Sequence, residues 1–85
     1  MVNVDIYTTP YCPFCTRAKK LLANKKVEFN EIDLSENPDK FEKMLSKSNG
    51  ARTVPQIFVN GEHIGDCDHI HDIDQKGELD KILKI

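Results

Sequence analysis

VNVDIYTTPYCPFC, residues 2–15, joins an alternating run of apolar and polar residues to two cysteines, and this junction decides how the chain folds. The alternation over residues 2–7 predicts a strand, and the threonines and proline that follow it predict a loop. Pro13 suits the first turn of a helix, because the N–H that proline lacks would have no partner there. The stretch therefore predicts a strand, a loop and a helix, with Cys12 and Cys15 where the helix begins.

Cys12 and Cys15 are spaced one helical turn apart, so they lie on one face of the predicted helix. One thiol can attack a disulfide and the other can close a disulfide behind it. A C-x-x-C motif at such a junction indicates a redox pair. Unpaired backbone N–H groups and the positive end of the helix dipole favour a thiolate at Cys12. We predict Cys12 as the nucleophile and Cys15 as the resolving thiol; the alternative for either is a structural cysteine.

Signals for a second strand and a second helix follow the first helix, which we expect to extend to about Asn24. Alternation over residues 27–33 predicts the second strand. Asn37 before Pro38 predicts the N-cap and first residue of the second helix. Residues 48–50, Ser-Asn-Gly, predict its end.

The last third of the chain predicts a hairpin and two helices. Residues 56–59 and 62–65 flank Asn60-Gly61, a pair that favours a tight hairpin turn. Asp68 can cap a third helix, and Gly77 separates that helix from a short final one. This order predicts an α/β fold, in which the first two strands are parallel and the last two antiparallel. The expected architecture is a four-stranded mixed sheet flanked by three main helices plus a short C-terminal helix.

Length and composition narrow the functions open to the chain. Its 85 residues predict one domain, residues 1–85, and its formal net charge of −2 gives no electrostatic case for a nucleic acid or a membrane partner. No apolar run approaches the ~18 residues of a membrane span, and the first residues lack the pattern of a signal peptide. Three cysteines, an odd number, fit a reducing compartment. We expect a cytoplasmic monomer in which His63 and the lysines at 19–20 and 25–26 are solvated.

The element order, with a redox pair after the first strand, resembles the thioredoxin-like fold, and the sequence resembles the glutaredoxin family within it. The features that carry the resemblance are a length typical of small bacterial glutaredoxins and three motifs, Tyr11-Cys12-Pro13-Phe14-Cys15, Thr53-Val54-Pro55 and Ile64-Gly65-Asp66-Cys67-Asp68. The resemblance spans nearly the whole chain. It implies a glutathione-dependent thiol–disulfide oxidoreductase that reduces protein–glutathione mixed disulfides and protein disulfides. Glutathione would be the co-substrate, supplied indirectly by the glutathione reductase system, and no cofactor would be tightly bound.

The resemblance also implies where glutathione binds. Pro55 would follow a cis peptide bond, and Val54 would present its backbone N–H and C=O to glutathione as one more strand edge. Residues 65–68 lead into the third helix, where free N–H groups would take the γ-glutamyl carboxylate. Asp68, or else Asp66, would take the amine. The alternatives are an ordinary proline opening a strand and an Asp68 that only caps the helix.

Aromatic and charged side chains complete the predicted site. Tyr11 and Phe14 flank the thiol and are expected to form the apolar wall of the groove. Arg52 and Arg17 are candidates for the glycine carboxylate of glutathione, with a solvated surface charge as the alternative for each. Cys67 is expected to pack the turn, with a regulatory thiol as the alternative. The residues predicted to contact glutathione are Tyr11, Phe14, Arg17, Arg52, Thr53, Val54, Pro55, Gly65, Asp66, Cys67 and Asp68.

Two other functions stay open from the sequence. A dimer could hold a 2Fe–2S cluster through Cys12 and glutathione thiols, although Pro13 departs from the C-G-F-S motif typical of cluster-binding relatives. The chain could instead be a redoxin reduced by thioredoxin reductase, although it has no tryptophan for the motif those proteins usually carry. We predict no metal site, because Cys67, His69 and His71 would lack a fourth ligand.

Overall fold

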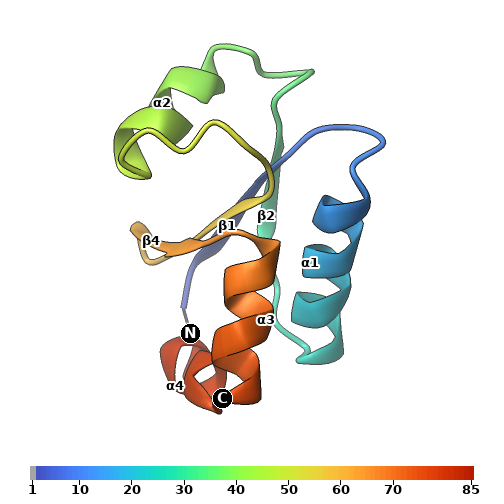
Figure 1. The fold of residues 1–85 in the computed structure, drawn as a ribbon, viewed down its shortest axis with the longest axis vertical. Helices are drawn as coiled ribbons and strands as arrows, with labels where there is room; N and C mark the ends of the chain where they lie inside the picture. Colours follow the sequence, from blue (N-terminus) through green and yellow to red (C-terminus); the bar gives the residue numbers. More distant parts are fainter. Residues whose placement is uncertain (1) are drawn as a thin grey trace.

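The computed structural model describes residues 2–85, so Met1 of the predicted domain lies outside it. The elements, in chain order, are β1 (Val4–Thr8), α1 (Pro13–Asn24), β2 (Asn30–Asp33), α2 (Lys40–Lys47), β3 (Gln56–Val59), β4 (Glu62–Gly65), α3 (Cys67–Gln75) and α4 (Glu78–Leu83) (Figure 1). The strands form one sheet in the order β2-β1-β3-β4. β1 is parallel to β2 and antiparallel to β3, and β3 is antiparallel to β4. The predicted four-stranded mixed sheet is confirmed.

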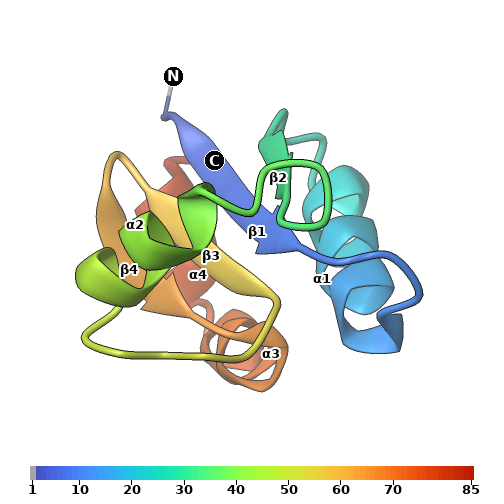
Figure 2. The same ribbon diagram turned by 90° about the horizontal axis from the view of Figure 1, so that it is seen from above.

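Helices cover both faces of this sheet, because apolar side chains alternate along β1 and point to opposite sides. Val4 and Ile6 face α1, α3 and α4, whereas Tyr7 faces α2 (Figure 1). Both views place α1 beside α3 (Figures 1 and 2). The buried core on the three-helix face consists of Val4, Ile6, Ala18, Leu22, Ile57, Val59, Cys67, Ile70, Ile73, Leu79 and Leu83. The smaller core under α2 consists of Tyr7, Leu34, Met44 and Phe58.

The second helix begins later than predicted. Its N-cap is Asp39 and not Asn37. The N–H groups of Lys40 and Phe41 donate to the carbonyls of Asn37 and Pro38, three residues back, so these residues form a tight turn ahead of the helix. The Asn37 side chain donates to the Asp33 carbonyl at 3.1 Å, which directs its amide away from the helix.

The third helix begins earlier than predicted. Asp66, and not Asp68, is its N-cap, and the Asp66 carboxylate accepts from the His69 N–H at 2.9 Å. Asp68 lies in the first turn, where a negative charge suits the helix dipole. The chain leaves β4 directly into this cap, so the helix starts as soon as the strand ends.

The lysine face of α1 is less solvated than predicted. The Lys25 ammonium lies 2.6 Å from carboxylate oxygens of both Asp74 and Asp80, which ties the end of α1 to α3 and α4. Its hydrogen bonds to Asp74 and Asp80 raise the pKa of Lys25. Lys19 pairs with Glu31 on β2 at 3.0 Å.

Candidate active site

Cys12 stands at the N-terminus of α1 with its thiol partly exposed. Its Sγ accepts a hydrogen bond from the Cys15 N–H at 3.1 Å. Donors and the dipole at a helix N-terminus stabilise negative charge on sulfur. The same Sγ lies 3.9 Å from the carbonyl oxygen of Val54, 42 residues along the chain. The fold therefore brings the first predicted motif against the second.

Cys15 lies one turn into α1 and is only 2% exposed. Burial, together with a hydrogen bond to Cys12, raises the pKa of the Cys15 thiol to about 12. Cys15 therefore stays a protonated thiol at neutral pH. The two cysteines have different environments, one open to solvent at a helix cap and the other enclosed behind it.

A pocket of about 250 Å³ lies next to the Cys12 thiol. It is lined by Phe14, Thr53, Val54, Pro55, Asp66, Cys67 and Asp68. All seven were predicted from the sequence as glutathione contacts. The pocket thus unites side chains from the start of α1, from the loop before β3 and from the start of α3.

The loop before β3 gives the pocket a free backbone edge. The Val54–Pro55 peptide bond is cis, as the resemblance implied. Within residues 2–85, the Val54 N–H and C=O form no backbone hydrogen bond. Backbone groups without backbone partners can pair with an extended peptide, as an added strand does.

The start of α3 supplies further backbone donors. The N–H groups of Cys67 and Asp68 have no hydrogen-bond partner among the residues that the structure covers, as expected in a first helical turn. Gly65 precedes this turn with φ +142°, and a Cβ there would lie 2.7–2.9 Å from side-chain atoms of His69. Only glycine fits this position without displacing His69.

Cys67 is buried, lines the pocket and lies close to a histidine. Burial raises the pKa of the Cys67 thiol. Its Sγ lies 3.5 Å from His71 Nδ1, and that nitrogen lies 2.8 Å from the Cys67 carbonyl oxygen. His69 instead packs over Gly65, so Cys67, His69 and His71 do not converge. Among residues 2–85, no three histidine, cysteine or acidic side chains are arranged to hold a metal ion.

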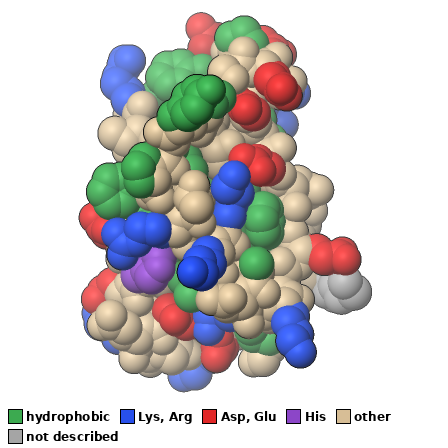
Figure 3. Space-filling model, turned by 90° about the vertical axis from the view of Figure 1, so that its right-hand side faces the viewer, with side chains coloured by type: hydrophobic (Ala, Val, Ile, Leu, Met, Phe, Trp, Pro, Cys, Tyr) green, Lys and Arg blue, Asp and Glu red, His purple; other side chains and the backbone are tan. Residues whose placement is uncertain are grey.

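Four predicted contacts do not line this pocket: Tyr11, Arg17, Arg52 and Gly65, the last of which lines a shallow neighbouring pocket with His63 and His69. Tyr11 is fully exposed, with φ +60°, so Phe14 alone lines the pocket as an aromatic wall. The Arg17 guanidinium stacks over the Phe14 ring at 5.9 Å and lines a separate groove between α1 and α3. Arg52 is exposed on the loop. Figure 3 shows the α1 side of the molecule, where lysine and arginine side chains gather.

Sequence reasoning missed Gln56, whose side chain contacts the pocket loop from behind. Its Nε2 donates to the Thr53 carbonyl at 3.0 Å, and its Oε1 lies 2.6 Å from His63 Nε2. The available signal was a polar residue opening the otherwise apolar run of residues 56–59.

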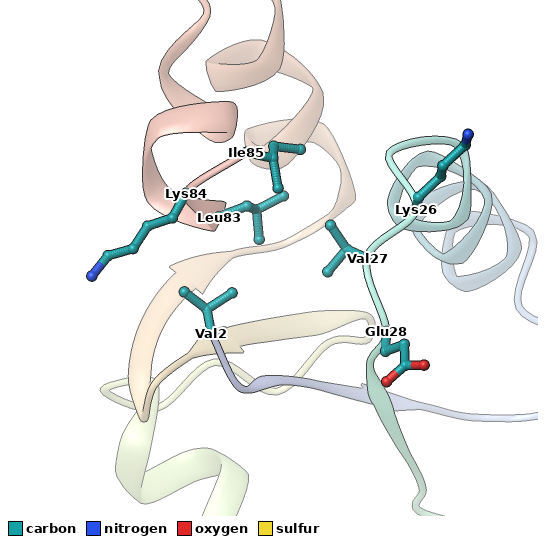
Figure 4. Close-up of a pocket in the computed structure, with 7 residues that line it drawn as sticks. All are labelled: Val2, Lys26, Val27, Glu28, Leu83, Lys84 and Ile85. Carbon is teal, nitrogen blue, oxygen red and sulfur yellow. The ribbon is translucent and has the colours of Figure 1, made fainter.

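A second pocket, of about 260 Å³, lies at the C-terminal end of α1, away from Cys12 (Figure 4). Val2, Val27, Leu83 and Ile85 line it, and the ammonium groups of Lys26 and Lys84 point away from it. No cysteine or histidine borders it. The thiol chemistry therefore belongs to the pocket beside Cys12. No helix within residues 2–85 has the length and hydropathy to cross a membrane.

Known proteins share both the sequence and the fold. The family model for glutaredoxin matches residues 4–64. Glutaredoxin 3 of Escherichia coli strain K12 is 49% identical over 84 residues, which cover 99% of this chain and 100% of that protein. The solution structure of a glutaredoxin from Brucella melitensis has a TM-score of 0.83 and 49% identity, over 99% of this chain and 90% of that one.

A buckwheat glutaredoxin, solved as a complex with glutathione, has a TM-score of 0.85 and 30% identity, over 95% of this chain and 76% of that one. These similarities confirm the predicted thioredoxin-like α/β fold. They agree with the close pair formed by Cys12 and Cys15. The chain belongs to the glutaredoxin family and is a glutathione-dependent disulfide oxidoreductase.

Proposed function

We propose that this glutaredoxin reduces protein–glutathione mixed disulfides and protein disulfides, with Cys12 as nucleophile and Cys15 as resolving thiol. The proposal rests on the different exposure and hydrogen bonding of the two cysteines. Cys12 is partly exposed and accepts a backbone hydrogen bond at a helix N-terminus, whereas Cys15 is buried, with a pKa raised to about 12. A substrate disulfide can reach Cys12 directly, and only a disulfide formed at Cys12 comes within reach of Cys15.

For a mixed disulfide, the Cys12 thiolate attacks the glutathione sulfur. A bond forms between the two sulfurs, the substrate protein leaves as a thiolate, and that thiolate takes up a proton. A second glutathione, as thiolate, then attacks the glutathione sulfur held on Cys12. Oxidised glutathione leaves and the Cys12 thiolate is restored. This cycle does not require Cys15.

For a protein disulfide, Cys12 attacks one sulfur and forms a mixed disulfide with the substrate. Cys15 loses its proton and attacks the Cys12 sulfur, which releases the substrate as a dithiol and leaves a Cys12–Cys15 disulfide. Two glutathione molecules reduce that disulfide in turn and leave as oxidised glutathione. The protein disulfide reaction therefore needs both cysteines.

Glutathione would bind in the pocket beside Cys12. The N–H and C=O of Val54, which form no backbone hydrogen bond within residues 2–85, would pair with the cysteine residue of glutathione, and the first turn of α3 would receive its γ-glutamyl carboxylate. Asp68 suits the amine better than Asp66, because the Asp66 carboxylate already caps α3. Arg17 and Arg52 remain candidates for the glycine carboxylate, from the margin of the pocket. The buckwheat glutaredoxin was solved as a complex with glutathione, which supports glutathione as the ligand of this chain.

We further propose that the chain acts as a cytoplasmic monomer of one domain, without a tightly bound cofactor, nucleic acid or membrane partner. Its partners would be glutathione and glutathionylated or disulfide-bonded proteins. The glutathione reductase system would supply reduced glutathione.

The test is glutathione-dependent reduction of a small mixed disulfide and of a protein disulfide, by the wild type and by the Cys12→Ser and Cys15→Ser variants. We expect Cys12→Ser to lose both activities, and Cys15→Ser to keep the first and lose the second. An inactive wild type would contradict the proposal, and activity with thioredoxin reductase would then identify the reductant. Full mixed-disulfide activity in Cys12→Ser would contradict the assignment of the nucleophile.

A further inference from the structure

Gln56 is a buried amide whose two ends are both hydrogen-bonded. It is 2% exposed and opens β3, directly after the loop that borders the pocket. Its Nε2 donates to the Thr53 carbonyl at 3.0 Å and lies 3.4 Å from the Thr53 hydroxyl. Its Oε1 lies 2.6 Å from His63 Nε2. A chain of three residues therefore connects β4, through β3, to the pocket loop.

The hydrogen bonds that link His63, Gln56 and Thr53 all donate in the same direction, from His63 toward Thr53. The amide nitrogen of Gln56 faces a carbonyl and must donate, so its oxygen faces His63 and must accept. His63 Nε2 therefore carries a proton, which both the Nε2–H tautomer and the imidazolium ion provide. Burial lowers the pKa of His63 below its usual 6.5, so the neutral Nε2–H tautomer is the form at pH 7. His63 thus acts as the terminal donor.

The sheet holds His63 in reach of Gln56. Alternate residues of a strand share a face, so Gln56 and Phe58 lie on the same side of β3. His63 pairs with Phe58 across the hairpin, and its ring centroid lies 5.1 Å from that of Phe58. Phe58 is 1% exposed in the core under α2. The histidine ring is therefore packed against a buried core side chain although its residue lies at the surface.

Val54 packs against the core under α2, but the pocket loop has few other hydrogen bonds. Thr53 and Val54 belong to no strand or helix. Within residues 2–85, the Gln56 amide makes the only hydrogen bond to the Thr53 carbonyl. The next residue, Val54, places its carbonyl oxygen 3.9 Å from the Cys12 sulfur. A rotation of the Thr53 peptide would turn the Val54 N–H, which belongs to the same peptide unit.

We infer that His63 and Gln56 are positioning residues, which hold the Thr53–Val54 peptide in the orientation that accepts glutathione beside Cys12. The inference rests on the proposed function, in which the Val54 backbone binds the cysteine residue of glutathione. His63 does not touch the substrate; it fixes the Gln56 amide, and Gln56 fixes the loop. Specificity for glutathione-linked disulfides then depends on a side chain of β4 outside the pocket beside Cys12.

The test compares His63→Leu, which removes the donor, with His63→Gln, whose side-chain amide reaches the place of Nε2. For His63→Leu we expect kcat/KM with a glutathione mixed disulfide to fall about 10-fold, mainly through a higher KM. Alkylation of Cys12 by iodoacetamide, which needs no backbone contact, should keep its wild-type rate. His63→Gln should restore kcat/KM to within about two-fold of the wild type. Gln56→Met tests the second member of the chain and should match His63→Leu.

The Thr53 and Val54 amide resonances give a readout apart from activity. They should move in His63→Leu and return in His63→Gln. Ile73→Val, in the core on the other face of the sheet, is the control for a general loss of stability, and its KM should be unchanged. Wild-type kcat/KM in both His63→Leu and Gln56→Met, or an equal loss in His63→Gln, overturns the inference. An inactive wild type contradicts the proposed function, whereas the amide resonances still decide the positioning role.

Discussion

Cys12 and Cys15 carry the same side chain and differ only in where α1 places them. Cys12 caps the helix and is partly exposed to solvent, and its Sγ accepts a hydrogen bond from the Cys15 N–H. Cys15 lies on the inner side of the first turn, where burial keeps its proton on. The chemical division between an attacking and a resolving thiol thus follows from one turn of helix and the burial of one face.

The raised pKa of Cys15 makes the folded protein sensitive to high pH. A thiol that holds its proton more tightly in the folded than in the unfolded state costs stability once the pH exceeds the unfolded value, here about 9. Between pH 7 and pH 10, we expect the free energy of unfolding of the wild type to fall by about 1 kcal/mol more than that of Cys15→Ser. Urea unfolding of both proteins under reducing conditions measures the difference. Equal losses would mean that burial does not perturb Cys15.

Gly65 should tolerate no side chain. Its φ of +142° disfavours any residue with a Cβ, and that Cβ would lie within 2.9 Å of three His69 atoms. We expect Gly65→Ala to lower the free energy of unfolding by about 2 kcal/mol. Gly61→Ala, with φ +83° and nothing within 4 Å of the added Cβ, is the control for a positive φ without a steric clash. A loss no larger in Gly65→Ala than in Gly61→Ala would show that His69 moves aside freely.

At the scale of the element, α3 shows how a helix start is chosen between two neighbouring aspartates. Asp66 leaves β4 with extended backbone (φ −95°, ψ −171°), the conformation typical of an N-cap, and its carboxylate reaches the His69 N–H. Asp68 is already helical and its carboxylate makes no hydrogen bond within residues 2–85. The strand end therefore selects the cap.

This arrangement predicts unequal effects of removing the two carboxylates. Asp66→Ala should lower the free energy of unfolding by about 1 kcal/mol, because the His69 N–H loses its acceptor. Asp68→Ala should cost only a few tenths of a kcal/mol, through the helix dipole alone. Thermal unfolding of the two variants under the same conditions shows which carboxylate contributes more to stability. A larger loss in Asp68→Ala would assign the cap to that residue instead. If Asp68 binds the glutathione amine, the same variant should also raise the KM for glutathione.

At the scale of the whole molecule, the sheet divides the core in two. The larger core lies under α1, α3 and α4, and Tyr7, Leu34, Met44 and Phe58 form the smaller one under α2. Both cores share the same central strands, β1 and β3. A chain of 85 residues buries a modest apolar surface, so neither core should be stable without the other.

We therefore expect one cooperative unfolding transition, even when a single face is weakened. Met44→Ala under α2 and Leu79→Ala under the other face should each cost about 3 kcal/mol. Circular dichroism and methyl NMR signals from both cores should change at the same urea concentration in each variant. Unfolding of the smaller core, which contains Met44, at a urea concentration where the larger core stays folded would contradict the single-domain prediction.

The sequence by itself determined the elements whose causes lie within a few residues. Alternation predicted β1 and β2, although β2 is only Asn30–Asp33 and not the whole of residues 27–33. Asn60-Gly61 predicted the hairpin of β3 and β4, Pro13 the start of α1, and the C-x-x-C spacing the redox pair. Such signals are local, because backbone preference, capping and side-chain spacing depend on immediate neighbours. The glutaredoxin resemblance added the pocket residues, which no local rule would have joined.

Only the tertiary structure decided what depends on contacts across the sheet. The 3.9 Å approach of Cys12 to Val54 requires the parallel and antiparallel pairing of β1, and the chain from His63 through Gln56 to Thr53 requires the hairpin register. Tyr11 and Arg17 flank the motif in sequence but lie outside the pocket, because sequence neighbours on a helix cap point in different directions. The burial of Cys15, and with it the raised pKa of its thiol, also depends on the tertiary structure, because the elements that pack against a side chain decide whether it is enclosed.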